Sequence, residues 1–94
     1  MDLGLEGKTA IVTGGSRGIG KACARELALE GVDVIVAARD IHRLEATARE
    51  LAQETGRRIV PVQVDTGNDE AVRSMVRAAA EAFGHLDILV NCAA

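Results

Sequence analysis

Aromatic side chains are almost absent from this chain of 94 residues, which has Phe83 but no tyrosine and no tryptophan. Basic residues do not gather into a run, and the formal net charge at pH 7 is −3. Surfaces that bind nucleic acid combine basic stripes with rings on which bases stack. We therefore expect no nucleic-acid partner.

Cysteine and long apolar runs are also scarce. The two cysteines, Cys23 and Cys92, lie far apart without metal-ligand spacing, which is typical of small buried residues in a reducing cytosol. A membrane-spanning run of about 18 apolar residues is missing, and residues 1–6 are too acidic for a signal peptide. These absences predict a cytoplasmic protein with no metal site and no membrane partner.

Short β-branched runs alternate regularly with longer amphipathic stretches along the whole chain. Hydrophobic residues make up 48% of it, which is enough for one domain with a packed core. The β-branched runs predict strands at 9–12, 32–38, 59–64 and 86–90. The amphipathic stretches predict three helices. The first covers 19–30, the second runs from a cap at Asp40 to a stop at Gly56, and the third begins within 66–69 and stops at Gly84.

This βαβαβαβ pattern predicts an α/β protein with a parallel sheet, because a helix joins each strand to the next. Pro61 lacks an N–H group for the ladder and places the third strand at an edge. With right-handed crossovers the expected strand order is 3-2-1-4, a truncated doubly wound sheet of the Rossmann type. The first two helices should then share one face. The apolar spacing predicts that the first helix packs through Ile19, Ala22, Cys23 and Leu27.

A glycine-rich segment, TGGSRGIG at residues 13–20, joins the first strand to the first helix. The free N–H groups at the start of a helix form an anion site. Gly14 permits a turn that other residues avoid, Gly18 lets a phosphate approach the backbone, and Gly20 lets the helix pack against the strand. We expect a phosphate-bearing ligand here, although a tight turn without a ligand would use the same residues.

Two kinds of phosphate-binding loop fit these glycines. Residues 15–21, GSRGIGK, match the GxxxxGK loop of nucleotide triphosphatases, but Ala22 stands where a Ser or Thr oxygen would hold Mg²⁺. The spacing TGxxxGxG is instead that of a dinucleotide loop. A P-loop-like nucleotide triphosphatase stays open as an alternative, and so does a non-catalytic dinucleotide-binding or interaction module.

Three motifs in order resemble the short-chain dehydrogenase/reductase family. They are the loop TGGSRGIG, the turn VDT at 64–66, and DILVNCAA at 87–94, which is similar to the NNAG motif of that family. The spacings between them agree with the family as well. The resemblance covers the whole chain but only the N-terminal part of a family member, and 3-oxoacyl-acyl-carrier-protein reductases are among the similar members.

The resemblance implies a role in cofactor binding for residues of each motif. Asp65 would accept a hydrogen bond from the adenine amino group beside the Thr66 backbone, and Asn91 would fix the loop at the adenine ribose. Asp65 also follows a parallel strand, where ligands bind, although it could instead cap the next helix. The implied cofactor residues of these motifs are Gly14, Ser16, Arg17, Gly18, Ile19, Gly20, Asp65, Thr66 and Asn91.

The end of the second predicted strand indicates which dinucleotide would bind. An acidic residue there binds the ribose 2′-OH of NAD, but this chain has Ala38 at that place and Arg39 next to it. A guanidinium suits a phosphate, and Arg17 could hold the same 2′-phosphate from the other side. We therefore expect NADP rather than NAD, while a solvated Arg39 is the alternative and Arg43 is a weaker candidate.

The catalytic residues that the resemblance implies, a Ser, a Tyr and a Lys, have no counterparts in this chain. It contains no tyrosine, and neither Lys8 nor Lys21 is in a YxxxK motif. We expect residues 1–94 to be the N-terminal NAD(P)-binding segment of an oxidoreductase and to be inactive alone, with the catalytic and substrate half absent. The complete protein is expected to be a homo-oligomer that transfers hydride between nicotinamide and a small carbonyl or alcohol substrate. Cys92 and Ala94 depart from the NNAG pattern.

Overall fold

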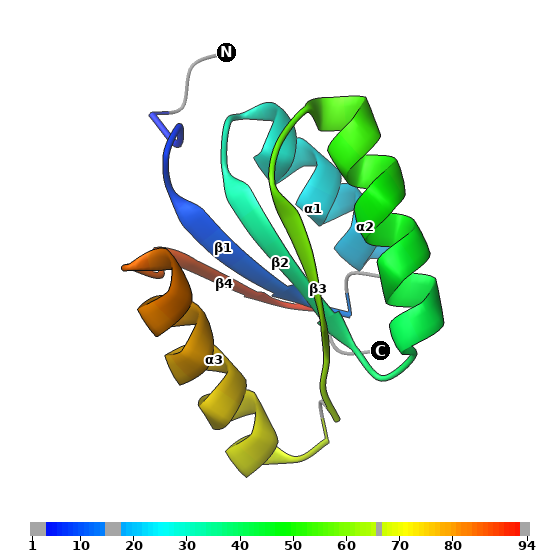
Figure 1. Cartoon of the computed structure of the whole chain (residues 1–94), viewed down its shortest axis with the longest axis vertical. Coiled ribbons are helices and arrows are strands. Elements are labelled where there is room, and N and C mark those ends of the chain that lie inside the picture. The colour runs from blue at the N-terminus through cyan, green and yellow to red at the C-terminus, as the bar shows by residue number, and fades with distance from the viewer. Residues whose placement is uncertain (1–3, 15–17, 66, 93–94) are drawn as a thin grey trace.

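The computed structural model describes residues 4–14, 18–65 and 67–92. Strands and helices alternate along these segments (Figure 1). In chain order the elements are β1 (Thr9–Thr13), α1 (Gly18–Leu29), β2 (Asp33–Ala38), α2 (Ile41–Thr55), β3 (Ile59–Gln63), α3 (Asp69–Phe83) and β4 (Ile88–Asn91). The predicted βαβαβαβ order is confirmed.

The strands form one parallel sheet in the order β3-β2-β1-β4. The predicted order 3-2-1-4 is therefore confirmed. Pro61 lies in β3 opposite Val36 of β2, at the edge where a missing N–H group costs no ladder hydrogen bond. The two central strands are almost completely buried, since each has a strand on both sides and helices on both faces.

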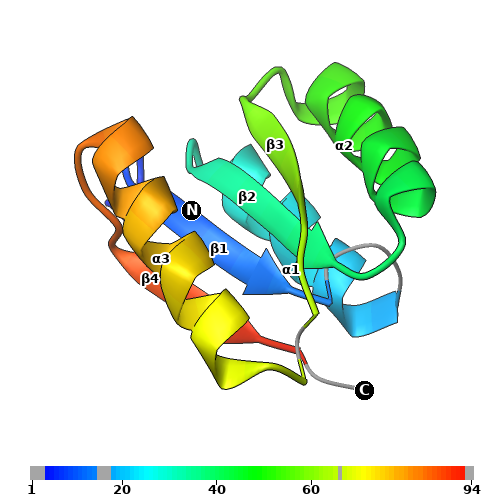
Figure 2. The same ribbon diagram turned by 60° about the horizontal axis from the view of Figure 1, so that its bottom comes forward.

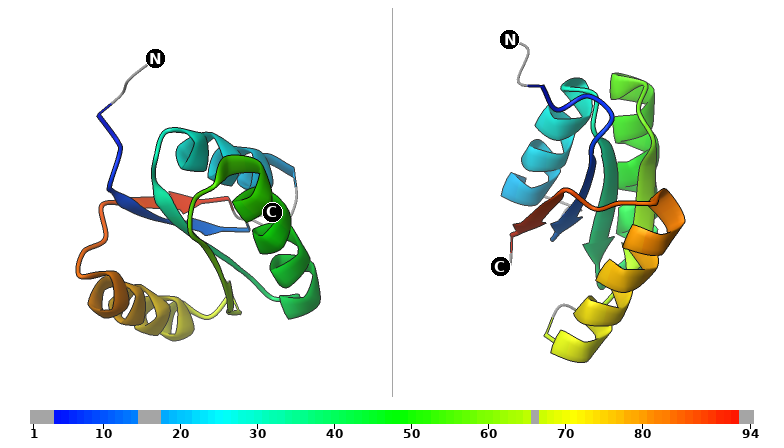
Figure 3. Two further views of the ribbon diagram at one scale, coloured as in Figure 1. Left: turned by 45° about the horizontal axis from the view of Figure 1, so that its top comes forward. Right: turned by 90° about the vertical axis from the view of Figure 1, so that its left-hand side faces the viewer.

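The helices cover the two faces of the sheet unequally. Figure 3 shows α1 and α2 on one face and α3 alone on the other, as the crossovers predict. Alternate residues of β1 serve the two layers: Ala10 and Val12 belong to the core beneath α1 and α2, and Ile11 belongs to the core beneath α3. None of the described helices is long and apolar enough to cross a bilayer.

The face through which α1 packs differs from the predicted one. The structure buries Gly20, Ala24 and Ala28, whereas Ile19 is 77% exposed and Leu27 is only half-buried. Small side chains let the helix approach the sheet closely, so the predicted stripe is wrong at Ile19 and Ala22, which are exposed, although Leu27 does pack against this core. This orientation leaves Ile19, in the first turn of α1, free of core contacts.

Local signals determine where the helices and strands begin and end. Asp40 caps α2 as predicted, and its Oδ1 accepts a hydrogen bond from the Arg43 N–H at 3.1 Å. Asn68 caps α3, so that helix begins at Asp69, at the late end of the predicted range. The fourth strand begins at Ile88, two residues later than predicted, and the Asp87 carboxylate just before it accepts from the Thr9 N–H of β1 at 2.9 Å.

Candidate functional site

The strands point the same way, so their carboxyl ends meet at one edge of the sheet (Figure 2). Gly14, Arg39, Asp65 and Asn91 all lie at or just beyond these ends. This is the edge at which α/β proteins bind ligands. The predicted site residues Ser16, Arg17 and Thr66 lie outside the described residues.

Gly14 makes the turn that leaves β1. Its φ of 74° is in the left-handed region that glycine adopts without strain, and its N–H donates to the Ala37 carbonyl oxygen at 2.7 Å. A Cβ at this position would collide with the carbonyl oxygen of Cys92, just after β4. The predicted turn is confirmed. The structure adds that glycine is needed at position 14 because the Cys92 backbone leaves no room for a side chain.

Gly18, the first residue of α1, has a different environment. Its φ is 62°, and a Cβ there would meet no described atom within 4 Å. The first turn of the helix contains no acidic residue that would repel an anion. Gly20, two residues further along the helix, is buried. Among the described residues, a phosphate could therefore approach the free N–H groups of this helix start without meeting a side chain at Gly18 or an acidic group in the first turn.

Arg39 and Asp65 form an ion pair that the sequence did not predict. Arg39 follows β2, Asp65 lies two residues beyond β3, and the distance from Nη2 of Arg39 to Oδ1 of Asp65 is 3.3 Å. The side chains are 76% and 50% exposed. An exposed pair contributes about 0–1 kcal/mol, so a ligand with a stronger charge could displace Asp65 from Arg39 at little cost.

Asp65 has a second role in the turn before α3. Its Oδ1 accepts a hydrogen bond from the Gly67 N–H at 2.9 Å, and its carbonyl oxygen accepts from the Asn68 N–H at 3.0 Å. The cap of α3 is Asn68, whose side chain accepts from the Ala71 N–H at 3.0 Å. The alternative in which Asp65 caps the helix is therefore wrong, although Asp65 does shape the approach to it.

Asn91 is fixed by β1. It lies opposite Thr13 in the parallel register, and the buried Thr13 hydroxyl donates to Oδ1 of Asn91 at 2.9 Å. This bond orients the amide and leaves its NH₂ group as the donor on the other side. The signal for this contact was present in the motif, since Thr13 opens TGGSRGIG, but the strand register was needed to connect the two residues.

Lys21 does not serve the helix start as the lysine of a triphosphate loop would. Its Nζ lies 2.6 Å from Oε2 of Glu50 on α2, and this hydrogen bond, with the positive charge, holds the pKa of the Glu50 carboxyl below its usual value. One helical turn further, Arg25 pairs with Glu54 at 3.0 Å. Together with Ala22, these contacts weigh against the triphosphatase alternative.

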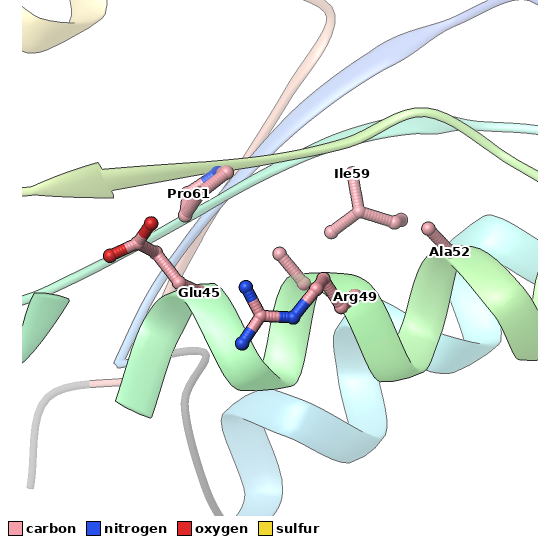
Figure 4. A pocket seen from close by; sticks show the side chains of 6 residues that line it. Glu45, Arg49, Ala52, Ile59 and Pro61 are labelled. Carbon is pink, nitrogen blue, oxygen red and sulfur yellow. The ribbon is translucent and has the colours of Figure 1, made fainter. Parts of the chain in front are cut away.

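Other polar features lie away from this edge. A hollow of about 210 Å³ lies between α2 and β3, where Glu45 and Arg49 flank an apolar floor that includes Ile59 and Pro61 (Figure 4). It has no converging polar groups of the kind that orient a ligand. In the described segments no three His, Cys, Asp or Glu side chains are grouped so that they could hold a metal ion. The only two histidines of the sequence, His42 and His85, are exposed.

The parallel sheet, the glycine turn and the open helix start define a protein of the Rossmann class. The sequence profile described as short chain dehydrogenase matches residues 8–94. The chain belongs to this family.

Individual relatives agree with the family assignment. The chain is 40% identical over 90 residues to a peroxisomal 2,4-dienoyl-CoA reductase of Pongo abelii, covering 96% of this chain and 31% of that protein. The crystal structure of L-sorbose reductase from Gluconobacter frateurii complexed with NADPH and L-sorbose matches with a TM-score of 0.93 and 42% identity, over 100% of this chain and 36% of that one.

An archaeal structure extends the likeness. An alcohol dehydrogenase from Thermococcus sibiricus, complexed with 5-hydroxy-NADP, matches with a TM-score of 0.80 and 40% identity, over 87% of this chain and 35% of that one. The chain thus spans about a third of the length of the relatives it matches.

Proposed function

We propose that this chain is the NADP-binding segment of an oxidoreductase that transfers hydride between a nicotinamide and a carbonyl or alcohol carbon. The observation that carries the proposal is the pairing of an open helix start at Gly18 with a guanidinium, Arg39, at the end of β2. The helix start suits a pyrophosphate, and the guanidinium suits the 2′-phosphate. The NADPH-bound sorbose reductase, which has the same fold over this length, supports the choice of cofactor.

The residues fit such a cofactor on chemical grounds. The N–H groups of Gly18, Ile19 and Gly20 would donate to the pyrophosphate, for which the missing side chain at Gly18 leaves room. Ser16 and Arg17 would complete the phosphate contacts, and Gly14 would hold the turn that presents them. The bound NADP would supply the hydride or accept it; this chain's residues bind and orient it.

The adenosine half of the cofactor would meet residues from three strand ends. The Asp65 carboxylate would accept from the adenine amino group, with the Thr66 backbone beside it, and the Asn91 NH₂ group would face the ribose. Arg39 would exchange the Asp65 carboxylate for the 2′-phosphate. Because the Arg39–Asp65 pair is exposed, this exchange costs about 1 kcal/mol or less, whereas a charge-assisted bond to phosphate contributes about 1.5–3 kcal/mol.

The substrate and the proton donor would come from outside these 94 residues. Reduction of a carbonyl needs an acid near the substrate oxygen, and this chain contains no tyrosine. The chain spans about a third of its relatives' length, so we assign the cofactor to residues 1–94 and the chemistry on a small substrate to a further segment. A non-catalytic dinucleotide-binding module is the second candidate, and the same lack of tyrosine favours it.

A titration of both cofactors tests the proposal. We expect the complete protein to bind NADPH more tightly than NADH, and Arg39→Asp combined with Arg17→Ser to reverse the order, with a shift of about tenfold or more. Arg77→Asp combined with Arg73→Ser makes the same charge change at two exposed positions of α3 and should leave both affinities unchanged. Equal affinities for NADPH and NADH in the unmutated protein would refute the role of Arg39.

A further inference from the structure

Gln63, the last residue of β3, reaches across to the turn that leaves β2. Its side-chain Nε2 donates a hydrogen bond to the backbone carbonyl oxygen of Arg39 at 2.9 Å. We propose that Gln63 is a positioning residue: by fixing the backbone of Arg39, it places the guanidinium for the 2′-phosphate of NADP and so contributes to the choice between NADP and NAD. This inference rests on the proposed cofactor function of Arg39.

The strand register brings the two residues together. Gln63 lies opposite Ala38, the last residue of β2, and Arg39 follows Ala38 in the chain. Ile59 and Pro61 of β3 line the hollow beside α2, and alternate residues of a strand share a face. Gln63 therefore projects on the side from which the chain enters α2, and Figure 2 shows that turn beside the end of β3.

Two different groups hold Arg39 at its two ends. Asp65 pairs with the guanidinium at 3.3 Å, whereas Gln63 bonds to the backbone. A phosphate would compete with Asp65 for the guanidinium. It cannot replace Gln63, because a phosphate oxygen and the Arg39 carbonyl oxygen are both acceptors. The bond from Gln63 therefore remains when the side chain of Arg39 exchanges Asp65 for the phosphate.

The backbone bond matters because the side chain of Arg39 has little packing to guide it. Most of that side chain is exposed, and a long exposed side chain loses rotamer entropy when it binds in one place. A fixed carbonyl at Arg39 limits where its Cα, and hence its guanidinium, can lie. Loss of the bond should therefore weaken contacts to the 2′-phosphate and leave contacts to the rest of the nucleotide unchanged.

Two nucleotides that differ only in the 2′-phosphate test this selectively. They are adenosine 2′,5′-bisphosphate and AMP, titrated calorimetrically into the complete protein. Gln63→Met keeps the size of the side chain but removes its donor, and should weaken bisphosphate binding about three- to tenfold while AMP binding stays unchanged. Gln53→Met, the matched control, makes the same change at an exposed position near the end of α2 and should change neither affinity.

A double variant shows whether Gln63 acts through Arg39. Arg39→Ser keeps the backbone carbonyl that Gln63 bonds to but removes the guanidinium. Adding Gln63→Met to Arg39→Ser should therefore weaken bisphosphate binding no further, because the two effects are coupled. A loss of the same size in both backgrounds would mean that Gln63 contacts the phosphate itself, and would overturn the positioning role.

Gln63→Asn provides a second variant in case Gln63→Met fails to fold. It keeps an amide that is one methylene shorter, and should show the same selective loss. An equal loss for both nucleotides, or no loss for either, would overturn the role of Gln63 and leave that of Arg39 intact. An unmutated protein that binds the bisphosphate no better than AMP would overturn both.

Discussion

Gly14 and Gly18 are both glycines with positive φ in one short segment, yet they serve different neighbours. Gly14 is needed because the Cys92 carbonyl oxygen occupies the place of a side chain, and Gly18 faces open space. The sequence motif gives no means to separate these roles, since it shows only where glycines stand. The contact across the sheet from β4 is what distinguishes them.

Substitutions at the two glycines should therefore have different consequences, one mainly for stability and the other mainly for binding. Gly14→Ala should destabilise the fold by more than about 2 kcal/mol, because a backbone clash adds to the cost of a left-handed conformation. Gly18→Val should cost about 1–2 kcal/mol of stability but abolish NADPH binding, because its side chain would fill the phosphate's approach. Thermal melts by circular dichroism and calorimetric titration with NADPH check both. Retained binding in Gly18→Val would mean that the cofactor lies elsewhere.

Asp87 is one residue through which the fold should respond to acid. The hydrogen bond from the Thr9 N–H, and after it the bond with His85 at 2.6 Å, lowers the pKa of the Asp87 carboxyl below its usual value. Its contribution to stability is present above the unfolded value and is lost as the pH falls through the lower folded value. Acid below about pH 4 should thus weaken the protein, and Asp87→Asn should flatten this part of the profile.

Urea unfolding at a series of pH values from 6 downward measures this effect. Glu26→Gln, an exposed change on α1, is the charge-matched control and should keep the profile of the unmutated protein. If Asp87→Asn left the pH dependence as steep as before, the hydrogen bond to Thr9 would have no part in it.

At the scale of elements, most of the fold could be predicted because the signals are local. Pro61, the cap at Asp40 and the stops at Gly56 and Gly84 each act on neighbouring backbone, and each is confirmed. The prediction failed where the surroundings of an element determine which of its faces is buried. The buried face of α1 consists of small residues chosen by close packing, so the spacing rule selected larger side chains such as Ile19 instead.

The candidate site was predictable only in part for the same reason. The carboxyl ends of parallel strands must meet, so Arg39, Asp65 and Asn91 were placed at one edge correctly. The hydrogen-bond and ion-pair partners of these residues depend on the register between neighbouring strands, which no local stretch of sequence encodes. The Arg39–Asp65 pair and the Thr13–Asn91 hydrogen bond therefore emerged only from the register.

At the scale of the whole molecule, the helices cover the two faces of the sheet unevenly. α1 and α2 share one face of the sheet, and α3 alone covers the other (Figure 3), where residues of β1, β2 and β3 but none of β4 belong to its core. Leu89 of β4 lies on the side of α3, next to Ile11, and is 54% exposed. In the described sheet β4 is also an edge strand. Parallel sheets normally have both faces covered, and an apolar edge strand tends to recruit another chain.

A polypeptide of these 94 residues should therefore self-associate. Light scattering and melting at several concentrations should show association that weakens in Leu89→Lys, because a charge on an edge strand disfavours pairing. Leu29→Lys changes an equally exposed leucine on α1 and should not affect it. A monomer whose melting is independent of concentration would contradict the role of this edge.

The central claim is that the helix start at Gly18 and the guanidinium of Arg39 together hold NADP. A crystal structure of the complete protein with NADPH measures this most directly. We expect the pyrophosphate against the N–H groups of Gly18, Ile19 and Gly20, and the 2′-phosphate on Arg39, which has left Asp65. A nucleotide bound elsewhere, or a 2′-phosphate in solvent with Arg39 still paired to Asp65, would contradict it.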